Sequence, residues 1–225
     1  MQEQPHLYWT PRSGGTFVWQ VLSRCISLDE EKRRDGHAFI ENLSCPIIIN
    51  YRDPRDIAVS YLRITQGKYD DNQELIYIPP TEHDIKKHII GVKSNFQILN
   101  QYKEVYGHRS DVLWLKYEDY IDDINILLDK IEAFMDIKID TDKRSEIARE
   151  TGRRKNIEIS KKVKHWRDDA SCDFDHYDIE SKIHKYHIYN GEYAGWRNYI
   201  PKEYHKMLNL ELSDELTKWE YQIEI

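Results

Sequence analysis

The chain has 225 residues, of which 40% are hydrophobic and 32% charged, an ordinary composition for a globular protein. No Pro/Gly/Ser-rich stretch or internal repeat marks a boundary, so we expect a single domain over residues 1–225. The formal net charge of −7 argues against a nucleic-acid binder that works through a basic surface, so no nucleic acid is expected as a partner.

The apolar runs and the cysteines of the sequence indicate the compartment in which the protein is expected. No run is long enough to cross a bilayer, and the polar residues 1–5 leave no room for a signal peptide, so no membrane partner is expected. Cys25, Cys45 and Cys172 are odd in number and far apart, which argues against a disulfide framework or a zinc site. We expect a cytoplasmic protein, or one of the host cytoplasm if the chain is viral.

The first predicted elements are a strand over residues 6–10, a tight turn over residues 13–15 and a helix over residues 16–22. This arrangement directs backbone N–H groups and a helix N-terminus at an anion. As a Walker A loop the segment is poor, because Gly15 takes the place of the lysine and Trp9 that of the first glycine. The segment predicts a phosphate-binding turn, although turns of this kind also occur as plain connections.

A second strand is predicted over residues 46–51, whose continuous apolar run is typical of a buried parallel strand. It ends at Arg52. Asp53 suits the N-cap of a following helix, and Pro54 suits its first position.

The start of this helix also carries polar groups that can bind phosphate. A guanidinium at Arg52 and a hydroxyl eight residues later at Ser60 can clamp a phosphate through charge-assisted hydrogen bonds. The alternative interpretation is a surface ion pair between Arg55 and Asp56 beside a capped helix, which leaves Arg52 unexplained.

The following segments complete the predicted fold. Residues 65–81 lack periodicity and are expected to form an irregular loop. Apolar residues at steps of three and four over residues 85–106 predict a long amphipathic helix, and a strand over 111–115 and a helix over 121–135 follow. Strands that alternate with helices imply an α/β fold with a central parallel β-sheet flanked by helices. Ligands of such sheets lie at the carboxyl ends of the strands.

Together these motifs resemble the cytosolic-type sulfotransferase family. The family's donor loop, P-[KR]-S-G-[TS]-[TS]-[WF], is matched by residues 11–17 except at Gly15. Its 3′-phosphate motif, R-[ND]-P-[KR]-D-x-x-V-S-Y, is followed closely by residues 52–61. A strand leading into Tyr-Glu-Asp at 113–119 and an F-[LM]-x-I sequence at 134–137 come in the family's order. The resemblance implies the sulfotransferase fold, which is similar to that of P-loop NTPases.

The resemblance is good from residue 6 to about residue 137 and partial near the C-terminus. The family's R-K-G-x-x-G-x-W-[KR]-N loop aligns with residues 189–198, where Tyr189 and Asn190 replace the basic pair. The cations at residues 153–155 could replace the lost phosphate contacts, or they could be a solvated helix end. The loop positions that match are Gly191, Trp196, Arg197 and Asn198.

The resemblance implies transfer of a sulfuryl group from 3′-phosphoadenosine 5′-phosphosulfate (PAPS) to an acceptor hydroxyl or amine by in-line displacement. The product is adenosine 3′,5′-bisphosphate (PAP), and no metal is needed. His37 is the expected general base, because it lies between the two donor motifs and a histidine pKa suits the role. The alternative interpretation is a plain surface histidine in a polar loop. Arg12 is the expected stabiliser of charge on the leaving phosphate. The implied donor-binding residues are Arg12, Ser13, Gly14, Gly15 and Thr16 for the 5′-phosphate, Phe17 and Tyr117 for adenine, and Arg52, Ser60, Gly191 and Arg197 for the 3′-phosphate.

Two other functions remain open. One is a P-loop kinase for a small hydroxyl compound, and the other is a non-catalytic nucleotide-binding protein of the same fold. Asp35 stands where many members of the family have a lysine, two residues before the histidine. This departure and those at Gly15, Tyr189 and Asn190 keep the second alternative open. The expected acceptor is a small molecule or a glycan, and the loop over residues 67–80 is predicted to cover its site as a lid. The oligomeric state is not predicted.

Overall fold

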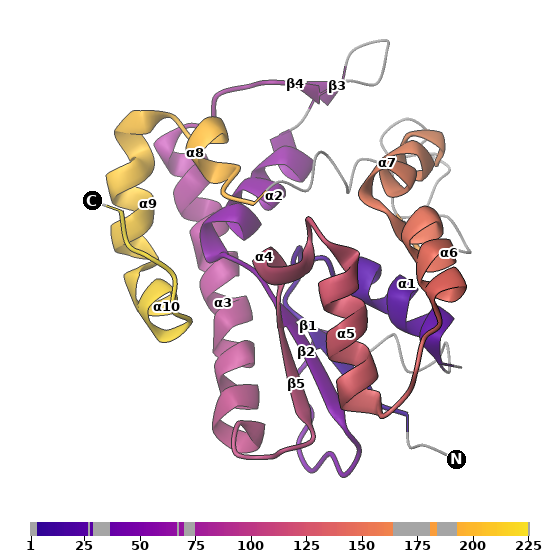
Figure 1. Cartoon of the computed structure of the whole chain (residues 1–225). Helices are drawn as coiled ribbons and strands as arrows, with labels where there is room; N and C mark the ends of the chain where they lie inside the picture. The colour runs from indigo at the N-terminus through magenta and orange to yellow at the C-terminus, as the bar shows by residue number, and fades with distance from the viewer. Residues whose placement is uncertain are drawn as a thin grey trace, which may run out of the picture.

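A computed structural model describes residues 4–26, 28, 37–66, 68–69, 75–163, 181–183 and 193–224. Its centre is a parallel sheet of three strands in the order β1-β2-β5 (Figure 1). The strands are β1 (His6–Trp9), β2 (Ile47–Tyr51) and β5 (Val112–Lys116). β2 pairs with both neighbours, so Ile47 lies opposite His6 on one side and Val112 on the other. The predicted parallel α/β sheet is confirmed.

Side chains of the strands alternate between two hydrophobic cores, as the pleat of a strand requires. Tyr8, Ile47 and Ile49 point into one core, which the helices between β2 and β5 and the C-terminal helices complete. Trp9 and Ile48 point into the other, which the helix after β1 and the first helices after β5 complete. The sheet is therefore covered on both faces, and this explains why β1 and β2 are almost continuously buried.

The helices follow the predicted order with some differences in their bounds. The helix expected over 121–135 begins at Ile124 as α5, because the Asp123 side chain accepts a hydrogen bond from Asn125 N at 2.9 Å and caps its start. A short helix, α4, precedes it and ends at Tyr120. The helices are α1 (Gly15–Cys25), α2 (Pro54–Gln66), α3 (Glu82–Tyr106), α4 (Tyr117–Tyr120), α5 (Ile124–Met135), α6 (Thr141–Thr151), α7 (Arg153–Lys162), α8 (Trp196–Tyr199), the 3-10 helix η2 (Lys202–Tyr204), α9 (His205–Glu211) and α10 (Ser213–Lys218).

The segment expected as an irregular loop contains a small antiparallel pair, β3 (Lys68–Tyr69) and β4 (Leu75–Ile76). Strands of two residues are too short to produce the alternation by which a strand is recognised in a sequence. Part of the predicted lid, residue 67 and residues 70–74, lies outside the described residues.

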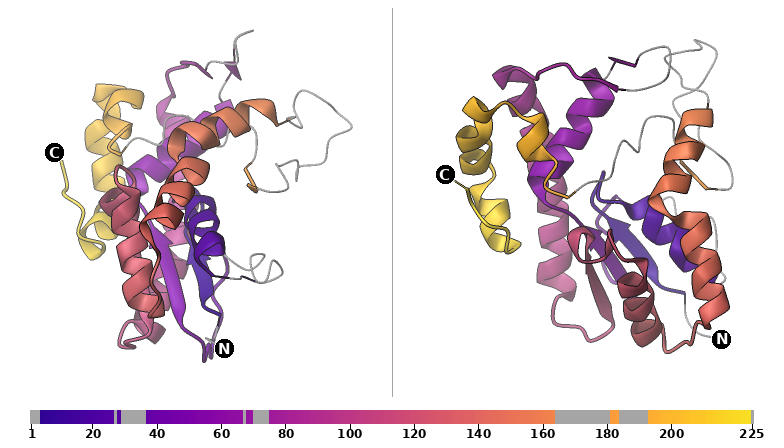
Figure 2. Two further views of the ribbon diagram at one scale, coloured as in Figure 1. Left: turned by 45° about the vertical axis from the view of Figure 1, so that its right-hand side comes forward. Right: turned by 45° about the horizontal axis from the view of Figure 1, so that its top comes forward.

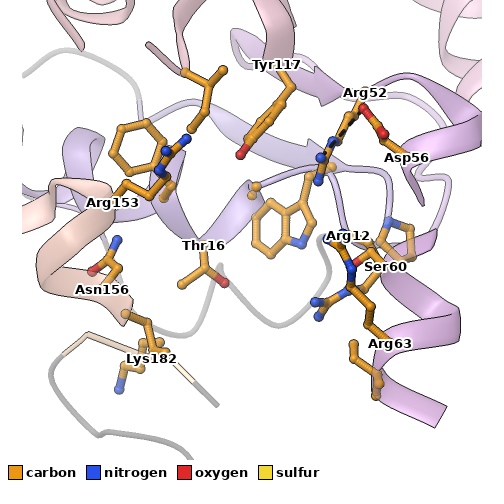
Figure 3. A pocket seen from close by; sticks show the side chains of 18 of the residues that line it. Arg12, Thr16, Arg52, Asp56, Ser60, Arg63, Tyr117, Arg153, Asn156 and Lys182 are labelled. Carbon is orange, nitrogen blue, oxygen red and sulfur yellow. Dashed lines mark hydrogen bonds and ion pairs between the residues drawn. The ribbon is translucent and has the colours of Figure 1, made fainter. Parts of the chain in front are cut away.

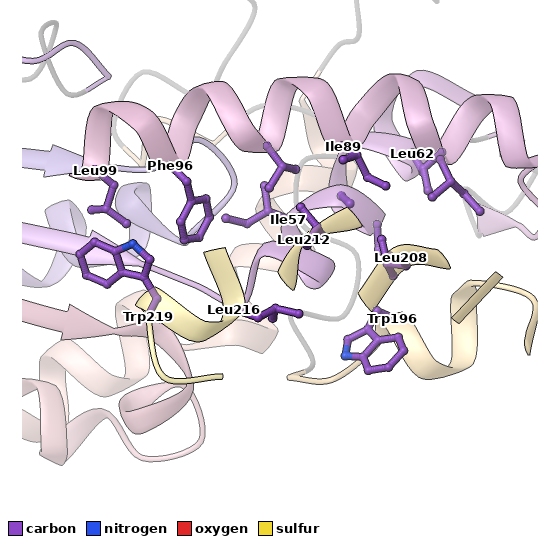
Figure 4. Packing of buried hydrophobic residues seen from close by; sticks show 14 of the residues in the cluster. Ile57, Leu62, Ile89, Phe96, Leu99, Trp196, Leu208, Leu212, Leu216 and Trp219 are labelled. Carbon is purple, nitrogen blue, oxygen red and sulfur yellow. The ribbon is translucent and has the colours of Figure 1, made fainter. Parts of the chain in front are cut away.

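The C-terminal helices flank α3 on the side of the molecule away from α6 and α7 (Figures 1 and 2). Leu208, Leu212 and Leu216 are fully buried and face Ile57 and Phe96 from α2 and α3 (Figure 4). The C-terminal segment thereby fixes the helix that begins at the strand end of β2. None of the helices in the described ranges has the length and apolar character to span a bilayer.

Candidate functional site

A cavity of about 680 Å³ lies where the segments after β1, β2 and β5 meet (Figure 3). Parallel strands end at the same edge of a sheet, so residues distant in sequence come together there. The predicted site residues that line this cavity are Arg12, Gly14, Gly15, Thr16, Phe17, His37, Arg52, Ser60 and Tyr117.

The turn after β1 depends on a glycine at position 14. Its φ of +88° is unfavourable for residues with a side chain, and a Cβ there would lie 2.7 Å from the Tyr117 ring. Gly14 is also the N-cap of α1 and supplies no capping side chain, and the first turn, from Gly15 to Phe17, carries no carboxylate. The N-terminal N–H groups and the positive end of the helix dipole therefore remain suited to an anion.

Gly15, the departure from the family's donor loop, is explained by Trp9. A Cβ at residue 15 would lie 2.1 Å from Cγ of the indole, so the ring occupies the space that a side chain would need. Trp9 is 9% exposed and lines the cavity itself. The sequence gives no signal for this contact, because residues 9 and 15 belong to different elements.

Ser13 lies behind the turn rather than in the cavity lining. Its Oγ donates to Asn50 O at 3.2 Å and its N–H donates to Thr10 O at 3.1 Å. Asn50 in turn donates from Nδ2 to Ser13 O at 2.8 Å and accepts from Tyr120 at 2.6 Å. The buried amide of Asn50 thus ties the turn to β2.

Arginines from two strand ends line the cavity. Arg12 adopts a left-handed backbone conformation with φ 68° and donates from Nε to Ser60 Oγ at 2.9 Å. Arg52 is 8% exposed, and its guanidinium carbon lies 4.4 Å from the centre of the Tyr117 ring. A cation at each strand end, with a hydroxyl from α2, is a suitable arrangement for phosphate or sulfate groups.

The interpretation of Arg55 and Asp56 as a surface ion pair is wrong. Arg55 pairs with Asp53 at 2.7 Å, whereas Asp56 lies 3.7 Å from Arg52, and both pairs are buried. The physical reason is that adjacent residues of a helix point in different directions, so Arg55 and Asp56 face different partners in the segment that leads into α2. Asp53 also caps α2 as predicted, since its side chain accepts from Arg55 N at 2.8 Å.

Asp56 links the Arg52 guanidinium to the C-terminal segment. Its carboxylate accepts hydrogen bonds from Ala194 N at 2.8 Å and Trp196 N at 3.0 Å. Burial raises the pKa of Asp56, while the charge of Arg52 and the two N–H donors oppose that shift. The turn that leads into α8 is therefore fixed beside Arg52.

His37 lies at the β1 end of the cavity, with its Nδ1 3.0 Å from Trp9 O. A backbone carbonyl can only accept a hydrogen bond, so Nδ1 donates and carries the ring proton. In the neutral ring Nε2 then holds the lone pair, as a general base requires. The Trp9 indole contacts the imidazole edge-on, with the ring centres 5.4 Å apart.

The cavity has further lining residues that were not predicted. Figure 3 shows Arg12, Ser60 and Arg63 on one side and Arg153, Asn156 and Lys182 on the other, with Thr16 between them. Arg63 follows Ser60 by three residues in α2, so helical periodicity could have revealed it. Arg153 was considered only as part of a basic cluster, and nothing in the sequence pattern singles out Asn156 or Lys182.

Some predicted positions are not brought into the cavity. Arg197 is exposed, pairs with Glu224 and lies over the Trp196 ring. Gly191, Tyr189 and Asn190 lie outside the described residues. Within the described ranges no group of three His, Cys, Asp or Glu side chains could hold a metal ion.

Comparison with known proteins identifies the class. The sequence model of the sulfotransferase domain family matches residues 36–218. A crystal structure of mouse sulfotransferase SULT7A1 complexed with PAP is similar, with a TM-score of 0.64 and 20% identity over 98% of this chain and 86% of that one.

Retinol dehydratase has a similar structure in two complexes. The complex with retinol and PAP has a TM-score of 0.56 and 16% identity over 97% of this chain and 82% of that one. The complex with androsterone and inactive cofactor PAP has a TM-score of 0.55 and 15% identity over 97% and 81%. No curated protein sequence matches the chain significantly.

The match covers most of the chain, and the chain therefore belongs to the sulfotransferase domain family. The structural likenesses, at low identity, establish that it has the sulfotransferase fold. The family places it among enzymes that transfer sulfuryl groups.

Proposed function

We propose that the chain uses PAPS as its sulfuryl donor and transfers the group to a hydroxyl or amine of a small molecule or glycan. The observation that supports this best is the meeting of Arg12, Arg52 and Ser60 in one cavity at the start of α1. Two cations beside a helix N-terminus fit a ligand with two separate anionic groups, as PAPS has.

The cavity has residues suited to the 5′-phosphosulfate, the 3′-phosphate and the adenine of this donor. The α1 N-terminus, Thr16 and Arg12 would hold the 5′-phosphosulfate, and Arg52 with Ser60 would hold the 3′-phosphate. Phe17 and Tyr117 would contact the adenine, Phe17 by stacking. The comparison structures of mouse SULT7A1 and retinol dehydratase contain PAP, which supports a donor of this type.

His37 would act as the general base. PAPS supplies an activated sulfuryl group, on whose sulfur the acceptor oxygen or nitrogen replaces the phosphate oxygen, which leaves with the bonding electron pair. His37 Nε2 would take the acceptor's proton, while Trp9 O keeps Nδ1 protonated and the ring in place. Arg12 would stabilise the charge that develops on the leaving phosphate.

The proposal predicts acceptor-dependent release of PAP from PAPS in a panel of phenols, sugars and amines. In the His37→Asn variant the amide can still donate to Trp9 O, but the base is lost. We expect its kcat to fall about 100-fold or more, with PAP affinity unchanged. Mass spectrometry of the acceptor and calorimetry with PAP measure the two quantities.

The control is His83→Asn, which alters an exposed histidine of α3 outside the cavity and should keep full activity. Full activity of His37→Asn would contradict the assignment of the base. Phosphate transfer from ATP with Mg²⁺, without transfer from PAPS, would favour the kinase alternative instead.

A further inference from the structure

The cavity face of α2 continues beyond the residues assigned to the donor. Val59, Ser60, Arg63 and Ile64 line the cavity, at the spacing of neighbours on one helix face. Arg63 lies three residues, or about 4.5 Å of helix rise, beyond Ser60. The order along the helix is therefore Asp56 beside Arg52, then Ser60 bonded to Arg12, then Arg63.

The Arg63 side chain is held by an aromatic ring. Its guanidinium carbon lies 4.8 Å from the centre of the Tyr199 ring, and Tyr199 is 5% exposed. Tyr77 donates to Tyr199 O at 3.0 Å and packs edge-on against its ring, with the ring centres 5.4 Å apart. A guanidinium placed against a fixed ring loses less conformational entropy when it binds an anion, so the site is preorganised.

The described wall of the cavity carries more positive than negative side chains. The described cationic lining residues are Arg12, Arg52, Arg63, Arg153 and Lys182, and the carboxylates are Asp56 and Asp122. Asp56 pairs with Arg52, and Asp122 is exposed. The part of the wall around Arg63 combines its positive charge with the apolar side chains of Val59 and Ile64.

We propose that Arg63 binds a negatively charged group of the acceptor, so that the preferred acceptors carry a carboxylate or another anionic group besides the hydroxyl or amine that reacts. This inference rests on the proposed function, because it takes Arg12, Arg52 and Ser60 as the donor's partners. Arg63 lies beyond them on α2, next to the chain that leads out of the predicted lid at Tyr77. The planar guanidinium matches a planar carboxylate with two parallel hydrogen bonds.

The test uses binding to the PAP-saturated protein, in which no sulfuryl group is present and no turnover occurs. The probes are 4-hydroxybenzoate and 4-hydroxybenzamide, which have nearly the same shape and differ in charge. We expect the wild-type protein to bind the carboxylate about tenfold more tightly than the amide, as one charge-assisted pair can produce. In Arg63→Gln this preference should disappear, while the affinity for PAP alone stays unchanged.

The matched control is Arg149→Gln, which removes a cation that is 74% exposed and outside the cavity, and should keep the preference. No carboxylate preference in the wild-type protein would overturn the inference. A loss of PAP affinity in Arg63→Gln would overturn it too, because Arg63 would then bind the donor. Failure of the wild-type protein to bind PAP would instead refute the proposed donor, and this inference with it.

Discussion

At the scale of residues, the turn after β1 depends on two glycines whose missing side chains leave room for aromatic rings. Gly14 is required by its backbone conformation and by the Tyr117 ring, whereas Gly15 is required by the Trp9 indole. The second contact accounts for a departure from the family's loop pattern that would otherwise suggest a weakened donor site. Trp9 also accepts the His37 hydrogen bond, so one residue supports both the loop and the expected base.

Gly15→Ala should therefore destabilise the protein by about 1–3 kcal/mol, because its Cβ would overlap the Trp9 ring. Gly91→Ala is a matched control, since a Cβ there meets nothing within 4 Å and alanine favours the helix. Urea unfolding of both variants measures the difference. If Gly15→Ala were as stable as Gly91→Ala, this would contradict the close contact between the Trp9 ring and residue 15.

At the scale of elements, α3 is a long helix whose N-terminus is fixed by a capping box. Thr81 Oγ1 accepts from Asp84 N at 3.3 Å, and the Asp84 carboxylate accepts from Thr81 N at 3.0 Å. The Thr81 hydroxyl also donates to the Asp84 carboxylate, at 2.5 Å. This bond first, and then the one from Thr81 N, lower the pKa of Asp84. A carboxyl group with a lowered pKa stabilises the fold above its unfolded pKa, and that contribution is lost as the pH falls through the folded value.

Asp84→Asn should consequently destabilise the protein at pH 7 by about 0.3–1 kcal/mol, the usual range for a carboxylate near a helix N-terminus. The difference from wild type should shrink as the pH falls below the normal aspartate value, because wild-type Asp84 then also becomes neutral. Melting curves across this range measure it, with Glu41→Gln, an exposed carboxylate of a loop, as control. A difference that stays constant with pH would exclude the capping carboxylate as its cause.

At the scale of the whole molecule, the C-terminal segment connects one core to the cavity. Its leucines pack on α2 and α3, and its backbone N–H groups at residues 194 and 196 bond to Asp56, which pairs with Arg52. Arg55 adds hydrogen bonds to Asn209 at 2.8 Å and to Gln222 O at 2.9 Å. Docking of this segment is thus coupled to the position of the Arg52 side chain.

Leu212→Ala should destabilise the protein by about 2–5 kcal/mol, because Leu212 is fully buried. Leu210→Ala is a nearby control, since Leu210 is 50% exposed and its loss should have an effect within about 0.5 kcal/mol. Denaturant midpoints compare the two variants. Equal effects would contradict the packing of the C-terminal helices on α2 and α3.

The sequence was sufficient for the central sheet because β1 and β2 are buried on both faces, and all three strands are short apolar runs that lead into polar residues. The loop glycines, Arg52 and Ser60 were found because their roles depend on local spacing. Trp9, Asn156 and Lys182 were missed because their roles depend on contacts between elements far apart in sequence. The predicted pair of Arg55 and Asp56 was wrong because residues that are adjacent in the sequence point in different directions at the start of a helix.

We propose that Arg52 belongs to a site for a nucleotide with a 3′-phosphate. Calorimetry of the wild-type protein and Arg52→Gln with PAP and ADP tests it most directly, because ADP lacks that phosphate. We predict that the wild-type protein binds PAP at least about tenfold more tightly than ADP, and that Arg52→Gln loses this preference. Equal affinity for the two nucleotides, or a preference that survives in Arg52→Gln, would contradict the account.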